Sequence, residues 1–309
     1  MDPLKYLKKE YSLEITPLNH IRKMIMFSPD HSAVERGSLG YIFRRGYHHY
    51  ALERQLLNYL KTSITFNQYV EIEDIKNEFD YVVAANANSL FAKQHGVWTG
   101  TFNAQIRIAT VIGEFKPTEV IMWLDTRYSK NGFCYMIPNS DKDAGLVQIV
   151  TDITNYELDY YWKEFLFTED IRYYISSTTD IEHDCGFVQP RQVDNVLLVG
   201  LSAGFTDNLV GCGGLNAIES GMLAARAMIY GKDYNTLSKP IFEDIVKLHE
   251  LRKVMNTLEN SQTNILIKTL GLPLIKKVIY NNPFFRVSST YRSAKLYNSF
   301  IKSKRRSIE

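Results

Sequence analysis

Residues 196–228 read VLLVGLSAGFTDNLVGCGGLNAIESGMLAARAM, and the order of residue types in this stretch decides the expected fold. A branched apolar run, typical of a buried strand, leads into a glycine-bearing loop, and a helical pattern follows. Glycine permits φ > 0 and lets the backbone pass close to a ligand. A helix that begins near Gly211 would direct its free N–H groups and positive dipole end into the loop. The stretch predicts a site for an anion or an electron-rich ring, or else a tight turn whose glycines serve packing.

The remaining strand patterns indicate two sheets. FDYVVAANA, from Phe79, is apolar and β-branched, which is typical of a buried parallel strand, and residues 193–200 return to the same sheet. Residues 101–153 consist of short apolar runs between turn residues, and this pattern predicts an antiparallel meander. Further strands are expected within 11–28, at 63–66 and at 69–72.

Helical periodicity marks the rest of the chain. Apolar residues in 47–61 recur with a period near 3.6 and form one stripe. The other expected helices cover 155–167, 211–229, 238–258, 262–280 and 286–304. Helices therefore dominate the chain after the glycine-bearing loop.

Composition excludes several classes of protein. The net charge of +2 gives no electrostatic case for a nucleic-acid partner. The three cysteines, Cys134, Cys185 and Cys212, are too few and too widely spaced for a disulfide framework or a metal site, and they favour a cytoplasmic location. No apolar segment is long enough for a signal peptide or a transmembrane helix. The basic end, 302–309, is expected to be a solvated tail, with contact to an acidic membrane surface as the alternative.

Aromatic residues make up 13% of the chain, with 20 Tyr and 16 Phe. Two explanations stay open, because tight core packing and an apolar, ring-lined cavity draw on the same residue types.

The glycine-bearing loop resembles the second FAD fingerprint of flavoprotein reductases and hydroxylases. The match runs without a gap from Gly200 to Gly221, and two departures from the pattern matter. Leu201 stands where the family has an acidic residue that bonds the ribityl chain, and Asn208 stands where it has a proline. The matching residues are Gly200, Ala203, Gly204, Phe205, Asp207, Gly211, Gly213, Ala217, Ile218, Ser220 and Gly221.

A second stretch, FCYMIPNSDKDAGLV at 133–147, resembles the motif that lines the substrate cavity of geranylgeranyl reductases. Phe133, Tyr135, Pro138 and Gly145 occupy motif positions, and Val147 replaces the final glycine. The alternative is that these residues form an aromatic strand that ends in a proline turn and has no role in substrate binding. The resemblance implies that these four residues bind an apolar substrate.

Two weaker matches lie upstream. DYVVAANANS, residues 80–89, resembles a turn of the same flavoproteins, with Asn86 in place of their aspartate. RRGYHHYALERQLL, residues 44–57, resembles a helix start whose arginine faces the cofactor, which points to Arg44 or Arg45. A solvent contact is the alternative for either arginine. The cofactor contacts that the resemblance implies are Arg44, Arg45, Asn86, Gly200, Gly204, Asp207, Gly211, Gly213, Gly214 and Asn216.

The family holds the ADP half of FAD with a strand–GxGxxG–helix unit near its N-terminus. Residues 1–40 contain only Gly37 and Gly40, so this unit is not among them. Truncation, a separate coding segment and loss of the unit are the open explanations.

These resemblances imply a geranylgeranyl reductase-type fold, α/β with an α+β insertion. We expect a partial FAD-binding Rossmann-like sheet from 1–97 and 186–235, an antiparallel β substrate domain from 98–185, and a C-terminal helical cap from 236–309. The implied function is FAD-dependent oxidoreduction of a small apolar substrate of the prenyl or lipid-like kind, with no metal and an unknown electron donor. The alternative is a non-catalytic binding protein on a decayed flavoprotein fold.

Overall fold

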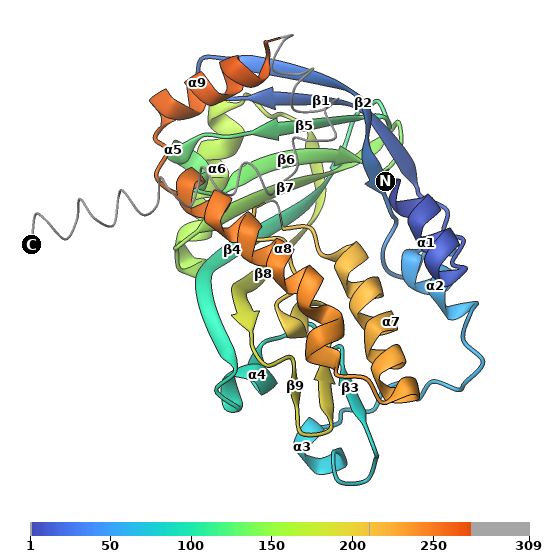
Figure 1. Cartoon of the computed structure of the whole chain (residues 1–309). Helices are drawn as coiled ribbons and strands as arrows, with labels where there is room; N and C mark the ends of the chain where they lie inside the picture. Colours follow the sequence, from blue (N-terminus) through green and yellow to red (C-terminus); the bar gives the residue numbers. More distant parts are fainter. Residues whose placement is uncertain (1, 210, 273–309) are drawn as a thin grey trace, which may run out of the picture. The chain divides into compact units, whose positions relative to one another are not determined.

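The computed structural model describes residues 2–209 and 211–272, which form two compact units interleaved in sequence (Figure 1). The first unit comprises the chain up to Ser63, then Asn103–His183, and a segment that begins at Thr257. The second comprises Ile64–Phe102 and Asp184–Asn256. We call them the sheet unit and the glycine-loop unit.

This division differs from the predicted one, which grouped 1–97 with 186–235. The reason is a long-range pairing. Strand β1 (Asn19–Phe27) pairs antiparallel with β2 (Ser32–Ile42) and parallel with β5 (Glu119–Trp123), so the N-terminal hairpin joins the predicted insert.

One seven-stranded sheet has the order β2-β1-β5-β6-β7-β4-β8. Each neighbouring pair in the run β5, β6, β7 and β4 is antiparallel, which confirms the antiparallel sheet predicted for 101–153. Only β5, β6 and β7 form a meander, because β4 pairs with β7 and not with β5. The long strand β8 was not predicted, because the exposed half of its sequence is mostly polar and contains few apolar residues. The remaining bounds are Trp98–Ile112 for β4, Phe133–Pro138 for β6, Asp143–Thr151 for β7 and Tyr174–Val188 for β8.

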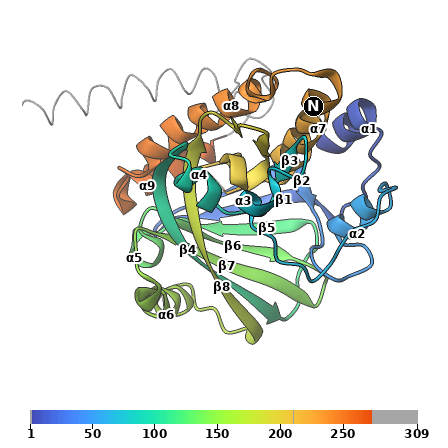
Figure 2. The ribbon, with the colours of Figure 1, turned by 90° about the horizontal axis from the view of Figure 1, so that it is seen from below.

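One face of this sheet is covered by α5 (Thr126–Ser129) and α6 (Leu158–Thr168), which lie together in Figure 2. The helix predicted at 155–167 is therefore confirmed, with a 3₁₀ turn at Asn155–Glu157 before it. Its start is a capping box in which the Thr154 N–H donates to the Glu157 carboxylate at 2.8 Å. The covered core consists of Ala109, Val111, Trp123, Tyr128, Cys134, Met136, Ala144, Leu146, Trp162 and Phe165.

Several local predictions were wrong. The helix expected at 47–61 is only α2 (Leu52–Leu57), and Leu57 and Leu60 are 39% and 51% exposed. A short helix is stabilised mainly by burial of its apolar stripe, and this stripe is buried only in part, with Leu52 and Leu56 half-buried. The strands expected at 63–66 and 69–72 do not form; Ile72–Ile75 is the short helix α3.

The N-terminal part also departs from expectation. Helix α1 (Pro3–Tyr11) was not predicted; Asp2 caps it by accepting the Leu4 N–H at 2.9 Å. Ser12 ends it in a left-handed conformation, so only the second of the two runs in 11–28 becomes a strand.

The glycine-loop unit is built on a three-stranded sheet of order β3-β10-β9, comprising Val82–Ala84, Val196–Leu198 and Gln192–Val193. Strands β3 and β10 are parallel, as the sequence predicts. Helices α4 (Leu90–Gln94), α7 (Gly214–Tyr230) and α8 (Tyr234–Met255) belong to this unit, and α7 and α8 pack side by side (Figure 1).

Strand β10 is buried on both faces. Val196 and Leu198 pack with Phe205 and Ile241, whereas Leu197 packs on the other side with a cluster that includes residues of α7. The Tyr234 hydroxyl also donates to the Leu198 carbonyl at 2.7 Å. This burial fixes the point at which the loop leaves the strand.

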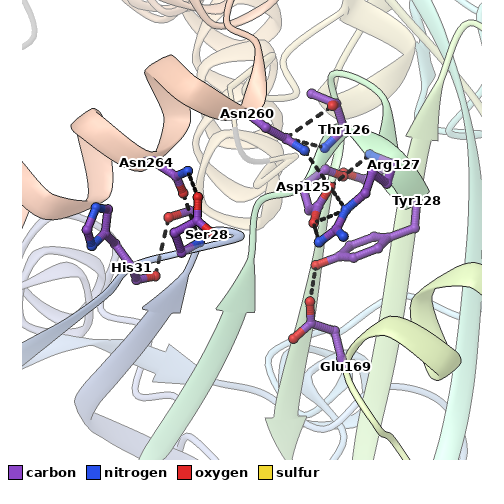
Figure 3. Close-up of polar contacts among 11 residues, drawn as sticks. Ser28, His31, Asp125, Thr126, Arg127, Tyr128, Glu169, Asn260 and Asn264 are labelled. Carbon is purple, nitrogen blue, oxygen red and sulfur yellow. Dashed lines mark hydrogen bonds and ion pairs between the residues drawn. The ribbon is translucent and has the colours of Figure 1, made fainter.

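Helix α9 (Asn260–Leu270) completes the sheet unit and covers the first part of the region predicted helical at 262–280, ending before Gly271. Residues 273–280, and the helix predicted at 286–304, lie outside the described residues. The Asn260 amide donates to Asp125 at 2.9 Å and accepts the Thr126 N–H at 2.9 Å. One turn later, Asn264 accepts the Asp30 N–H at 3.0 Å (Figure 3). Within the described chain, no helix is both long and apolar enough to cross a membrane.

We predict that Asn260→Ala lowers the free energy of unfolding by about 1–3 kcal/mol, because it strips hydrogen bonds from the buried Asp125 and from Thr126. Urea denaturation followed by circular dichroism measures the change. Ser261→Ala, at the exposed neighbouring position, is the control and should change stability by less than about 0.5 kcal/mol. Equal effects of the two substitutions would contradict the role of Asn260.

A second prediction concerns His249 in α8, whose ring packs edge-on against Phe187. Burial, aided by Lys253, lowers the pKa of His249 to about 4 from 6.5. As the pH falls through this window, the unfolded chain binds a proton that the folded chain does not, so the free energy of unfolding falls. We expect a smaller loss between pH 6.5 and pH 4 in His249→Gln, measured by urea denaturation at each pH. Parallel curves for the two proteins would refute this assignment.

Candidate functional site

The loop between β10 and α7 has the backbone that its glycines predict. Gly200, Gly204 and Gly211 have φ values of 57°, 68° and 77°, in the left-handed region that favours glycine. A 3₁₀ turn at Gly200–Ala203 opens the loop, and α7 begins at Gly214, with Gly213 as its N-cap. The predicted strand, loop and helix are therefore present in that order.

Two of these glycines serve close packing. A Cβ atom at Gly200 would lie 3.2 Å from that of Ala217, and the Gly200 N–H donates to Ser220 Oγ at 2.9 Å. A Cβ atom at Gly204 would lie 2.6 Å from the Gly186 carbonyl oxygen. The tight-turn interpretation thus accounts for both positions.

The start of α7 is different, because it is open. Among the described atoms, none lies within 4 Å of a Cβ built at Gly211 or at Gly214, and both residues are exposed. Gly213 provides no side chain to cap the first-turn N–H groups. The positive end of the helix dipole and these N–H groups are accessible to an anion or a polar ring edge.

The polar residues of the loop mostly support its own shape. Asp207 accepts the Leu209 N–H at 2.6 Å, and the Asn216 amide donates to the Phe205 carbonyl at 3.1 Å. Asn208 is 2% exposed, and neither atom of its amide has a hydrogen-bond partner within the described chain. A buried amide without partners is costly, so Asn208 is a polar group to which a ligand would add a favourable contact.

Asn86 comes from the turn after β3 and reaches the same loop. Its side-chain carbonyl accepts the Ser202 hydroxyl at 2.8 Å. Leu201, in the position of the family's acidic residue, is half-buried. The sequence did not single out Ser202, and it gave Ser220 only as one of the residues that match the fingerprint; the burial of both beside glycines becomes visible only when loop and helix are placed together.

The predicted arginines lie in the sheet unit. Arg45 is exposed and forms an ion pair with Glu53. The backbone carbonyl of Arg44 accepts the Leu52 N–H at 2.9 Å, which helps to start α2.

The predicted substrate residues also belong to the sheet unit, on strands β6 and β7. Phe133 and Tyr135 share one sheet face, with ring centroids 5.8 Å apart, and Gly145 lies on the same face. This face is the one opposite the core beneath α6, which contains Cys134 and Met136. Pro138 pairs with Ala144 and so lies on the α6 side, away from the other three.

No protein-family model and no curated protein sequence match this chain. Its structure is similar to that of a geranylgeranyl bacteriochlorophyll reductase-like protein from Thermoplasma acidophilum, with a TM-score of 0.67 and 15% identity over 93% of this chain and 87% of that one. The fold is shared. The flavin-dependent brominase Bmp2 gives a TM-score of 0.60 at 13% identity, over 93% of this chain and 82% of the brominase. The predicted fold class, and the structural likeness to geranylgeranyl reductase-type proteins, are confirmed.

We predict that Gly204→Ala lowers the free energy of unfolding by at least about 2 kcal/mol, because a left-handed φ and a backbone overlap act together. Gly221→Ala is the matched control. Gly221 lies within α7, and a Cβ atom added there would point into open space. The alanine should therefore raise helix stability by up to about 1 kcal/mol. Thermal and urea denaturation of both variants measure the difference. A tolerated alanine at 204 would show that the loop can relax.

Proposed function

We propose that this protein is a flavin-dependent oxidoreductase that acts on an apolar, prenyl- or lipid-like substrate. The single observation that carries the proposal is the open, uncapped start of α7 at the end of the glycine-bearing loop. The shared fold with a reductase-like protein and a flavin-dependent brominase supports it.

The residues around the start of α7 fit the ring end of a flavin. The backbone at Gly211 and Gly214 leaves space for it, and the Asn208 amide offers one donor and one acceptor. The dipole of the 17-residue helix α7 favours negative charge at this point, which is the charge of a reduced flavin ring. Hydride transfer is the chemistry that a bound flavin supplies.

The substrate side of the proposal rests on Phe133, Tyr135 and Gly145. Two neighbouring rings on one sheet face, with a glycine beside them, offer an apolar surface that suits a hydrocarbon chain. Phe133 is buried and Tyr135 is half-buried, so the rings are held in place by the sheet. In this proposal Pro138 has no substrate contact, because it faces the α6 core.

The described residues offer few contacts for the ADP half of FAD. The described chain provides no strand–GxGxxG–helix turn to hold a pyrophosphate. Leu201 removes a charged hydrogen-bond acceptor, a loss of about 1.5–3 kcal/mol, or roughly ten- to a hundredfold in affinity. We therefore propose that this chain binds FAD weakly and distinguishes it little from FMN.

The second candidate function is that of a non-catalytic binding protein on the same fold. Leu201 favours it, because it cannot make the charged contact to the cofactor that the family's acidic residue makes. Purified protein separates the two: a yellow protein that is bleached by dithionite supports the oxidoreductase. A colourless protein that takes up neither FAD nor FMN supports the binding protein.

Titration calorimetry with both flavins gives the quantitative prediction. We expect FAD and FMN to bind with affinities within about tenfold of each other. Gly214→Ala should keep the melting temperature but weaken both flavins by about tenfold, because its methyl group enters the open space at the start of α7. Gly221→Ala, in the same helix, should bind as the unaltered chain does. Tight, FAD-selective binding would contradict the proposal for the ADP half.

A further inference from the structure

We propose that a cavity on the α6-covered face of the sheet unit binds a small organic cation with an apolar body. The cavity has a volume of about 330 Å³, at the lower end of the range for small-molecule sites. Ile121, Trp123, Met136, Ile171 and Tyr173 form its apolar walls, and the Glu169 carboxylate lies among them. It is on the opposite sheet face from Phe133 and Tyr135, so the inference does not depend on the proposed flavin chemistry.

Glu169 is the chemical centre of this cavity. It caps the C-terminus of α6, and the Tyr128 hydroxyl donates to its carboxylate at 2.8 Å (Figure 3). Burial raises the pKa of Glu169, so the charged form lacks solvation that it would have in water. The side chain of Trp123 lines the same cavity and, like the Tyr128 hydroxyl, favours the charged form of Glu169, which lowers its pKa.

The nearby guanidinium does not neutralise this carboxylate. Arg127 is held by Asp125, to which its Nε donates at 2.8 Å and 3.0 Å, as Figure 3 shows. Across the described ranges, Glu169 has no ion-pair partner. A half-buried carboxylate that has hydrogen-bond donors but no cation is a ready acceptor for a charged N–H donor.

The walls are fixed before a ligand arrives. Trp123 packs edge-on against Phe165, with centroids 5.4 Å apart, and Tyr173 packs against Phe115 at 5.1 Å. A Cβ atom at Gly113 would lie 2.8 Å from the Tyr173 ring, so a glycine at position 113 leaves the space that this ring occupies. Preset aromatic walls favour the binding of a cation with an apolar body.

The charged residues that line the cavity determine which charge a ligand can carry. Asp170 and Arg172 line the cavity and form an ion pair with each other, so together they add no net charge. The remaining charge is that of Glu169, which would repel a carboxylate or a phosphate. A primary ammonium on an aryl or short alkyl group satisfies both the carboxylate and the walls.

The test uses the full chain and phenethylammonium as the probe, with binding followed by calorimetry and by tryptophan fluorescence. The neutral isostere 2-phenylethanol should bind at least about tenfold more weakly, because it lacks the charge-assisted hydrogen bond. Glu169→Gln should lose about tenfold in affinity for the ammonium and little for the alcohol. Glu114→Gln, at a side chain that is 92% exposed, removes the same charge and should change neither.

A second variant keeps the test valid if Glu169→Gln unfolds. Tyr173 is 39% exposed, so Tyr173→Ala should fold, and it should weaken both probes together by removing a wall. Equal binding of the ammonium and the alcohol to the unaltered chain would overturn the inference. Unchanged ammonium binding in Glu169→Gln, or no binding of either probe, would overturn it as well.

Discussion

The glycine-loop unit depends on three backbone segments that meet with almost no space between them. A Cβ atom at Gly204 would lie 2.6 Å from the carbonyl oxygen of Gly186 in β8, and a Cβ atom at Gly186 would lie 2.7 Å from the carbonyl oxygen of Thr99 in β4. Only residues without a side chain allow this stack. Because the stack fixes where the loop turns, it also fixes where α7 begins and which of its N–H groups remain accessible. The position of the candidate site therefore depends on close packing between residues that carry no catalytic group.

Strand β6 gives the sheet unit two different surfaces from consecutive residues. Tyr135 faces the side proposed for an apolar substrate, whereas Met136 faces the cavity with Glu169. The first surface is built from rings and a glycine, and the second adds one desolvated carboxylate. Each therefore suits a different chemistry, although both are built on one strand.

Local patterns predicted the parts of the fold whose partners are near in sequence or whose residues leave little choice. The run 196–228 specifies its strand, loop and helix because glycine and β-branched residues have narrow conformational preferences. The antiparallel strands of 101–153 follow from alternation and turns, but the pairing of β4 with β7 does not. Neither rule shows that β1 pairs in parallel with β5, the contact by which the two observed units divide the chain differently from the predicted domains. Similarly, 63–72 has strand-like residues but finds no strand to pair with.

The candidate site, like the fold, could be predicted from the sequence only in part. Glycine register located the loop, but it did not separate Gly200 and Gly204, which serve packing, from Gly211 and Gly214, which are open. The unpartnered amide of Asn208 and the lone carboxylate of Glu169 have no sequence signal, because each is defined by what surrounds it in space.

The two amides that hold α9 carry a consequence for how this region tolerates change in length. Asn260 and Asn264 lie one turn apart on the helix, and they bond to Asp125 and Asp30 at the ends of two different strands. Each residue rotates a helix by about 100°, so one residue inserted between them would turn one amide away from its strand. Changes in length should therefore be tolerated less between Asn260 and Asn264 than in the connection before Asn260, where the spacing of the two amides is preserved.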